Sequence, residues 1–194
     1  MTTRRQSLTV LTALTAMSTL PGLLATTTTA AAQGTNEPPA EVRAALPGAR
    51  LQGQMRFRWF GLTIYDTRLW VAGEPISAQD YATRPFALEL LYARKLGGAD
   101  IADRSVDEMR RIDRVEDRQA GDWRAAMVAA FPDVVSGDRL TGLHQPGRGA
   151  RFFHNTRPTR EVADAEFARL FFGIWLSPRS PEPTLRQALL GATG

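Results

Sequence analysis

Apolar and polar residues alternate near the start of residues 51–71, which is the pattern of a strand with one apolar and one polar face. The alternating positions are Gln54, Met55, Arg56, Phe57, Arg58 and Trp59. Gly61 predicts a kink or bulge, after which the β-like pattern continues over residues 62–70. Residues 85–93 predict a further strand, because they are apolar and lie between turn-forming residues.

Helices are predicted mainly in the second half of the chain. Ser105 and Glu108 have the spacing of a capping box, which predicts a helix over residues 105–114. Apolar residues recur at helical spacing in several later segments. Those segments predict helices over residues 122–130, 164–175 and 184–190.

A β-hairpin is predicted where residues 140–144 and 150–155 flank a glycine-rich turn. That turn is not a dinucleotide-binding loop, because the glycine spacing is wrong and strands lie on both sides. Hairpin-paired strands with helices at irregular intervals are typical of an α+β fold with an antiparallel sheet. We therefore expect α+β architecture.

Residues 1–32 differ in composition from the rest of the chain and are typical of an export signal. Arg4 and Arg5 precede an uncharged run over residues 8–25, and the alanines at 30–32 provide a small-residue cleavage site. The paired arginines also resemble the twin-arginine export motif. We expect a signal peptide cut after residue 32, a periplasmic or secreted protein, and no stable membrane insertion after cleavage.

After this signal, we expect a flexible lead-in with one short helix over residues 33–47 and a single domain over residues 48–194. The absence of cysteine excludes disulfide scaffolds, thiol nucleophiles and iron–sulfur sites. The formal net charge is +4, part of which comes from the signal, so the domain is close to neutral. It lacks the positive field that binding to a phosphate backbone requires, and we expect no nucleic-acid partner.

The lysine and histidine residues of the chain do not form a recognisable cofactor- or metal-binding motif. Lys95, the only lysine, does not follow a phosphate-binding glycine loop. His144 and His154 both fall in the predicted hairpin, but no cluster of acids accompanies them. We therefore expect no metal and no other cofactor.

The polar face of the first predicted strands carries the candidate binding chemistry. Arg56 and Arg58 lie on one strand, and Tyr65 and Arg68 lie on the next segment. Such a face ordinarily contacts solvent. If it instead faces a cavity, an arginine there can hold a carboxylate or an enolate with paired hydrogen bonds.

Several segments, taken in order and spacing, resemble the chalcone isomerase-like family, in particular its exported bacterial branch. They include FGLTIYDTRLW and FFGIWLSP, and they cover residues 60–70, 88–92, 136–140, 146–150, 171–178 and 185–191. The resemblance implies an open-faced β-sandwich, in which a large antiparallel sheet is layered against helices with a ligand cleft between. It also implies two possible functions, because plant members cyclise chalcones whereas non-catalytic relatives bind fatty acids.

The resemblance carries over the family's catalytic residues only in part. The positions of the catalytic threonine, tyrosine and asparagine fall on Phe60, Ile101 and Glu108. The side chains that polarise the substrate are therefore absent. The family's arginine corresponds to Arg56, with Arg50 and Arg58 as alternatives.

These substitutions imply a non-catalytic protein that binds a small amphipathic carboxylate, with a fatty-acid-like tail in the cleft and Arg56 on its anionic end. The predicted ligand-binding residues are Arg56, Arg58, Phe60, Tyr65 and Ile101. One alternative is an isomerase, an intramolecular lyase in which Tyr65 and Tyr92 act as acids. Another is a structural partner of the cell envelope with an empty cleft.

Overall fold

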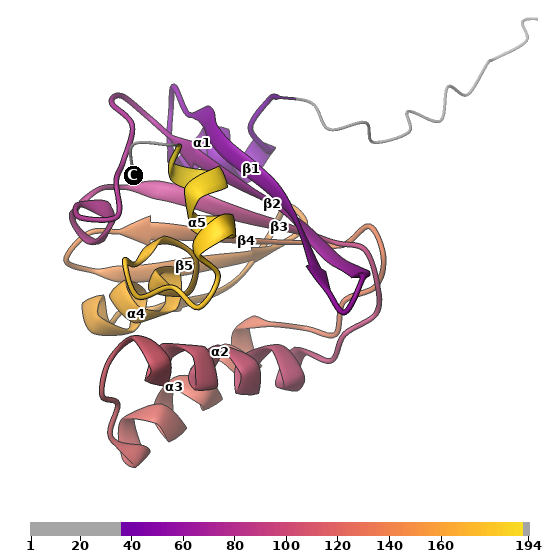
Figure 1. The fold of residues 1–194 in the computed structure, drawn as a ribbon, viewed down its shortest axis with the longest axis vertical. Coiled ribbons are helices and arrows are strands. Elements are labelled where there is room, and N and C mark those ends of the chain that lie inside the picture. Colours follow the sequence, from indigo (N-terminus) through magenta and orange to yellow (C-terminus); the bar gives the residue numbers. More distant parts are fainter. Residues whose placement is uncertain (1–35, 192–194) are drawn as a thin grey trace, which may run out of the picture. The chain divides into compact units, whose positions relative to one another are not determined.

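A six-stranded antiparallel sheet forms the centre of the computed structural model, which describes residues 36–191 (Figure 1). The strands lie side by side in chain order, so each one pairs with its neighbours in sequence. They are β1 (Arg50–Trp59), β2 (Leu62–Val71), β3 (Phe86–Tyr92), β4 (Arg139–Gln145), β5 (Gly149–His154) and β6 (Arg157–Val162). A 3₁₀ turn, η1 (Tyr81–Thr83), precedes β3. The predicted signal peptide lies outside the described residues.

The helices lie mostly on one face of this sheet (Figure 1). They are α2 (Gly98–Ile112), α3 (Asp117–Ala130), α4 (Ala165–Leu176) and α5 (Pro183–Leu190), whereas α1 (Ala40–Ala45) lies on the opposite face. α4 packs against β4 and β5, α5 packs against β1 and β2, and α2 packs against α4. A large antiparallel sheet layered against helices confirms the predicted α+β fold. Within residues 36–191, no helix has both the length and the apolar composition to span a bilayer.

The β1–β2 connection differs from the predicted kink, because residues 60 and 61 form a tight hairpin turn. Phe60 and Gly61 have φ angles of 46° and 78°, the left-handed conformations that a two-residue hairpin turn requires. Trp59 and Leu62 pair directly across this turn. The register irregularities of the two strands lie elsewhere, between Leu51 and Gly53 and between Phe57 and Arg58.

The start of α2 also differs from the prediction, since the helix begins at Gly98 rather than near Ser105. Ser105 lies inside the helix and donates a hydrogen bond to the carbonyl oxygen of Ile101 at 2.8 Å. The capping-box prediction is therefore wrong. Gly98 is packed so closely that a Cβ atom there would lie 2.0 Å from the carbonyl oxygen of Phe131, and glycine is required for this contact.

α4 is buried on nearly all sides, which explains its almost uniformly apolar sequence. The Asp164 side chain caps its first turn, where one carboxylate oxygen accepts hydrogen bonds from the N–H groups of Glu166 and Phe167, each at 2.9 Å. The other oxygen accepts a hydrogen bond from Nε1 of Trp123 at 2.8 Å. One carboxylate thus fixes the start of α4 and joins it to α3.

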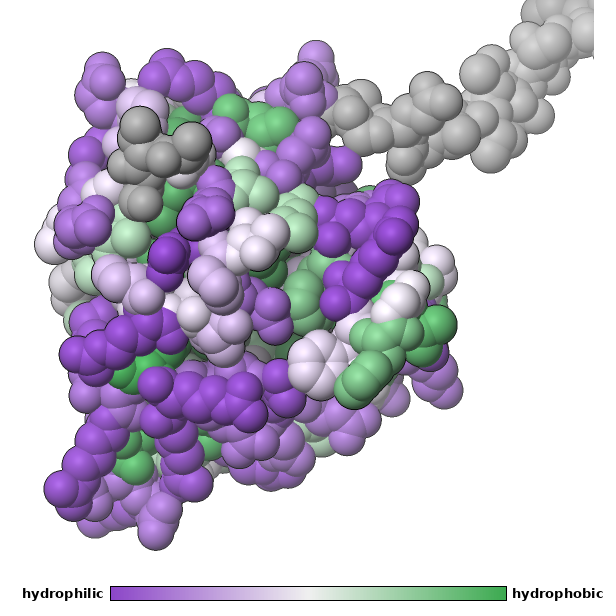
Figure 2. Space-filling view, in the orientation of Figure 1, coloured by the Kyte–Doolittle hydropathy of each residue, from purple (hydrophilic) through white to green (hydrophobic). Residues whose placement is uncertain are grey.

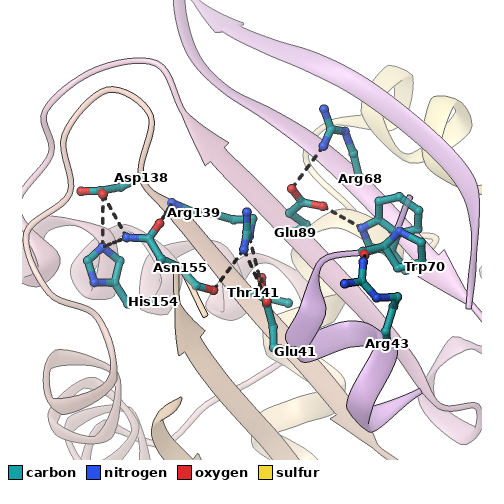
Figure 3. Close-up of polar contacts among 11 residues, drawn as sticks. Glu41, Arg43, Arg68, Trp70, Glu89, Asp138, Arg139, Thr141, His154 and Asn155 are labelled. Atoms are coloured by element: carbon teal, nitrogen blue, oxygen red, sulfur yellow. Dashed lines mark hydrogen bonds and ion pairs between the residues drawn. The ribbon is translucent and has the colours of Figure 1, made fainter. Parts of the chain in front are cut away.

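On the opposite face of the sheet, α1 is held by apolar contacts and by polar contacts, the latter drawn in Figure 3. Its apolar contacts form a small cluster of Val42, Leu46, Trp70, Ala87, Leu143 and Phe153. The buried carboxylate of Glu41 accepts hydrogen bonds from Nε of Arg139 at 3.1 Å and from Oγ1 of Thr141 at 2.9 Å. α1 is the short helix that the lead-in sequence predicts.

A second buried carboxylate, Glu89 of β3, lies beside this cluster (Figure 3). It accepts hydrogen bonds from Nε1 of Trp70 at 2.7 Å and from Nη1 of Arg68 at 3.3 Å. Burial is the main reason that the pKa of Glu89 is raised, and these two donors oppose the shift. Both buried carboxylates on this face therefore have the donors that buried charges require.

Candidate ligand cavity

A cavity of about 320 Å³ lies between the helix-covered face of the sheet and helices α2 and α4. This volume is near the lower end of the range for ligand pockets, which is roughly 300–1,000 Å³. Strand alternation determines which side chains face the cavity, as in β3, where Leu88, Leu90 and Tyr92 line it and the residues between them face the other side.

The buried part of this cavity is aliphatic and aromatic. Its lining consists of Leu88, Leu90, Phe131, Leu140, Phe152, Phe171, Phe172 and Ile174. The rings pack edge to face, with centroids 5.0 Å apart for Phe131 and Phe152 and 5.2 Å apart for Phe171 and Phe172. Walls of this kind offer no hydrogen bonds to a ligand and are suited to a hydrocarbon chain.

Charged side chains from α2 lie where the cavity meets solvent. Arg104 and Glu108 form an ion pair, and Nη1 of Arg111 lies 3.2 Å from each carboxylate oxygen of Glu108. Glu108 is buried, whereas both arginines are exposed. One carboxylate thus contacts two guanidinium groups, and the three side chains together carry one net positive charge.

Two further carboxylates, Asp100 and Glu182, line the same opening. Neither takes part in an ion pair with another of the described residues. The opening therefore presents a guanidinium to an anionic head group and two unpaired carboxylates to a cationic one. The relative affinities for acids and for amines with the same chain therefore show which head group the opening binds.

Two tyrosines place hydroxyl groups within the cavity. Oη of Tyr65 accepts a hydrogen bond from Nε1 of Trp175 at 3.1 Å. The hydroxyl of Tyr92 has no hydrogen-bond partner among the described residues. Burial raises the pKa of both tyrosines well above the usual range. Both therefore stay protonated at neutral pH, and Tyr92 can donate a hydrogen bond to a ligand.

The structure brings two of the five predicted ligand-binding residues, Tyr65 and Ile101, to this cavity. Arg56 lies on the opposite face of the sheet, where Nε and Nη2 donate to the two carboxylate oxygens of Asp66 at 2.7 and 3.0 Å. The reason is strand alternation, because Phe57 occupies the inward position and its neighbour Arg56 must face outward. This geometry corrects the placement of Arg56 in the cleft.

The other predicted residues also lie away from the cavity lining. Arg58 is exposed and pairs with Thr63 across the hairpin. Phe60 occupies the turn itself, with 90% of its surface exposed. Arg50, the remaining alternative, donates a hydrogen bond to the carbonyl oxygen of Gly73. None of the three is among the residues that line the cavity.

Arg104 is the charged cavity residue that sequence reasoning missed. It follows Ile101 by three residues and precedes Glu108 by four, which places all three on one face of a helix. This signal is readable only if residues 98–112 are taken as one helix. A helix predicted to start near Ser105 leaves Ile101 and Arg104 outside it, so the shared face was missed.

Comparison with known proteins identifies the family. A family model described as chalcone isomerase-like matches residues 51–191, which is most of the chain. The chain therefore belongs to the chalcone isomerase-like family, as its sequence resemblance implies. The matched residues begin after α1, so the contacts of Glu41 involve a segment outside that match.

Two similar proteins give further context. An uncharacterized protein of Haemophilus influenzae is 33% identical over 110 residues, which are 57% of this chain and 54% of that protein. The aligned part is thus about half the length of this curated relative. The crystal structure of an Arabidopsis thaliana fatty-acid binding protein has a TM-score of 0.56 and 10% identity, and the likeness covers 74% of this chain and 87% of that one. At this identity, the likeness establishes the fold alone.

Proposed function

We propose that this protein binds a small amphipathic acid, such as a fatty acid, in the cavity and does not convert it chemically. The observation that carries this proposal is a cavity of about 320 Å³ with an apolar buried lining and a guanidinium, Arg104, at its opening. The hydrocarbon chain occupies the aromatic part, where burial of apolar surface drives binding. The carboxylate lies at the opening, where Arg104 supplies charge-assisted hydrogen bonds.

Membership of the chalcone isomerase-like family supports a ligand cleft between sheet and helices. The fold likeness to a protein described as fatty-acid binding supports the choice of an amphipathic acid as ligand. The unpartnered hydroxyl of Tyr92 adds a neutral donor that a carboxylate or a hydroxyl group can use.

The cavity's own chemistry supports the non-catalytic part of the proposal. General acid–base catalysis works best with groups whose pKa values lie near the operating pH, and burial moves Tyr65 and Tyr92 in the other direction. The carboxylate oxygens of Glu108 already contact two arginines, Arg104 and Arg111. Ile101 has no polar group to offer.

Binding of three ligands with one chain and different head groups tests the proposal. Titration calorimetry with dodecanoic acid, dodecanol and dodecylamine should show that the acid binds about tenfold more tightly than the alcohol, since charge-assisted hydrogen bonds contribute roughly 1.5–3 kcal/mol. Arg104→Gln should remove this advantage and leave the alcohol's affinity unchanged. Arg111→Gln is the matched control, because Arg111 also contacts Glu108 but does not line the cavity.

Two outcomes would contradict the proposal that the ligand is an amphipathic acid. If dodecylamine binds as tightly as dodecanoic acid or more tightly, Asp100 and Glu182 determine head-group selection, and the ligand is a cationic amphiphile. If none of the three compounds binds, the cavity does not serve an amphipathic ligand, and a structural role in the cell envelope becomes the better account.

The location of this activity outside the cytoplasm is a further part of the proposal, supported by the export-signal pattern of residues 1–32. Mass spectrometry of the protein recovered from cell-envelope fractions measures its N-terminus. We expect a chain that begins at Gln33. A chain that retains Arg4 and Arg5 in the exported fraction would contradict cleavage, and a protein found only in the cytoplasm would contradict export.

A further inference from the structure

The tip of the β1–β2 hairpin exposes three large hydrophobic side chains. Trp59, Phe60 and Leu62 are 45%, 90% and 55% exposed, respectively. Single exposed hydrophobic residues are ordinary on protein surfaces, but contiguous groups mark interaction sites. Figure 2 shows the hydrophobic colouring gathered over this end of the molecule, next to strongly hydrophilic side chains.

The most exposed aromatic residue of the turn, Phe60, has a backbone conformation that aromatic residues rarely adopt. Phe60 has a φ of 46°, in the left-handed region. Its ring packs edge to face against that of Trp59, with centroids 5.2 Å apart, but 90% of the residue's surface stays exposed. An aromatic residue at this position gains little within the isolated fold. Its ring is instead presented to the surroundings.

Positively charged side chains surround this tip. Arg58 precedes the turn on β1, and the loop after β3 carries Arg94 and Lys95, all three exposed. That loop lies along the end of β2, because the N–H of Ala93 donates to the carbonyl oxygen of Ile64 at 2.9 Å. None of the three cations forms an ion pair with another described residue, so their charge is available to a partner.

The tip is continuous with the opening of the cavity. Trp59 both belongs to the tip and lines the cavity, and the guanidinium carbon of Arg104 lies 5.3 Å from the centroid of its ring. A surface that covers the tip would therefore also face the opening. A partner surface that itself consists of amphipathic molecules would then lie directly at the cavity opening.

We infer that the hairpin tip docks on the surface of an anionic lipid bilayer. Phe60 and Leu62 enter the interfacial region, where aromatic and aliphatic side chains partition favourably, and Arg58, Arg94 and Lys95 contact lipid phosphates. An anionic bilayer fits the tip because Arg58, Arg94 and Lys95, the unpaired charges on the hairpin and the adjoining loop, complement lipid phosphates. Docking places the opening against the membrane, so that a ligand can exchange without crossing water. The exchange, unlike the docking, rests on the proposed function.

The absence of cysteine from the chain allows a position-specific test with the full-length protein. Leu62→Cys, labelled with a nitrobenzoxadiazole fluorophore, reports on the tip while Trp59 and Phe60 remain. Val128→Cys on α3 is the matched control, because Val128 is also an exposed aliphatic residue, 40% accessible, on another element. Each protein is mixed with vesicles of phosphatidylcholine alone or of phosphatidylcholine and phosphatidylglycerol in equal parts.

Docking predicts a blue shift and increased intensity for the label at 62 with the anionic vesicles, weaker changes with phosphatidylcholine alone, and no change for the label at 128. Phe60→Ser or Lys95→Glu in the labelled background should each weaken vesicle binding by about fivefold or more. Added salt should weaken it further. These measurements contain no fatty acid, so they can succeed or fail independently of the ligand-binding test.

Three results would overturn the inference. A label at 62 that reports a water environment in every vesicle sample excludes docking through the tip. Equal shifts at 62 and 128 show that membrane contact is not specific to the hairpin. A blue shift that grows with protein concentration in the absence of vesicles shows that a second copy of the chain covers the tip instead.

Discussion

Replacing Phe167 with alanine should lower the free energy of unfolding by about 3–5 kcal/mol, the range for truncation of a buried phenylalanine. Phe167 is fully buried in the first turn of α4, and its ring packs 5.5 Å from that of Phe171, centroid to centroid, and 5.8 Å from that of Trp123. Truncation leaves a void between α3, α4 and β5 that these rigid rings cannot fill. Urea denaturation of Phe167→Ala and the unmodified protein, followed by circular dichroism, measures the difference.

Phe60→Ala is the control for this experiment, because it removes the same side chain from a position that is 90% exposed. Its free energy of unfolding should change by no more than about 0.5 kcal/mol. A loss below about 1 kcal/mol for Phe167→Ala would contradict the packing of α4 against the sheet. A large loss for Phe60→Ala would mean that the hairpin tip is covered by another part of the protein.

Strand alternation predicted the orientation of β1 better than the family resemblance did. On pattern alone, the face that carries Arg56 and Arg58 is expected to contact solvent, as it does in the structure. The resemblance placed Arg56 in the cleft because it matched a family arginine by sequence position, with Arg50 and Arg58 as alternatives. The inward side of β1 at this point belongs to Phe57 and Trp59.

Strand β6 and the first half of α2 could not be recognised from periodicity, for different physical reasons. β6 is an edge strand whose residues are almost all exposed and include Pro158, so it has no apolar alternation to detect. α2 starts at Gly98, which tight packing against the carbonyl oxygen of Phe131 requires, and glycine is ordinarily a signal against a helix. Both elements depend on tertiary contacts that no local pattern contains.

The candidate site, like the fold, could be predicted from the sequence only in part. The aromatic wall could be anticipated from the apolar strands and from α4, and Tyr65 and Ile101 do line the cavity. The charged opening could not be anticipated, because it combines α2 with the loop that contains Glu182, and these segments are far apart in sequence. Their proximity exists only once α2 packs on α4.

Filling the cavity should abolish chain binding without damaging the fold. Ser105 is a small, buried residue on the cavity-facing side of α2, and its hydroxyl only duplicates a helical hydrogen bond to the carbonyl oxygen of Ile101. In Ser105→Phe, the benzyl group occupies a substantial part of the 320 Å³ that a hydrocarbon chain needs. Dodecanoic acid, dodecanol and dodecylamine should all bind at least about tenfold more weakly, by the same factor, as titration calorimetry can measure.

Ser105→Ala separates loss of space from loss of the hydroxyl, and it should leave all three affinities unchanged. The unfolding free energy of Ser105→Phe should fall by no more than about 1 kcal/mol, because the added ring fills existing space rather than displacing packed atoms. Unchanged binding to a folded Ser105→Phe protein would show that the chain binds elsewhere. A uniform loss across the three head groups, set against the acid-specific loss expected for Arg104→Gln, assigns the tail to the cavity and the carboxylate to its opening.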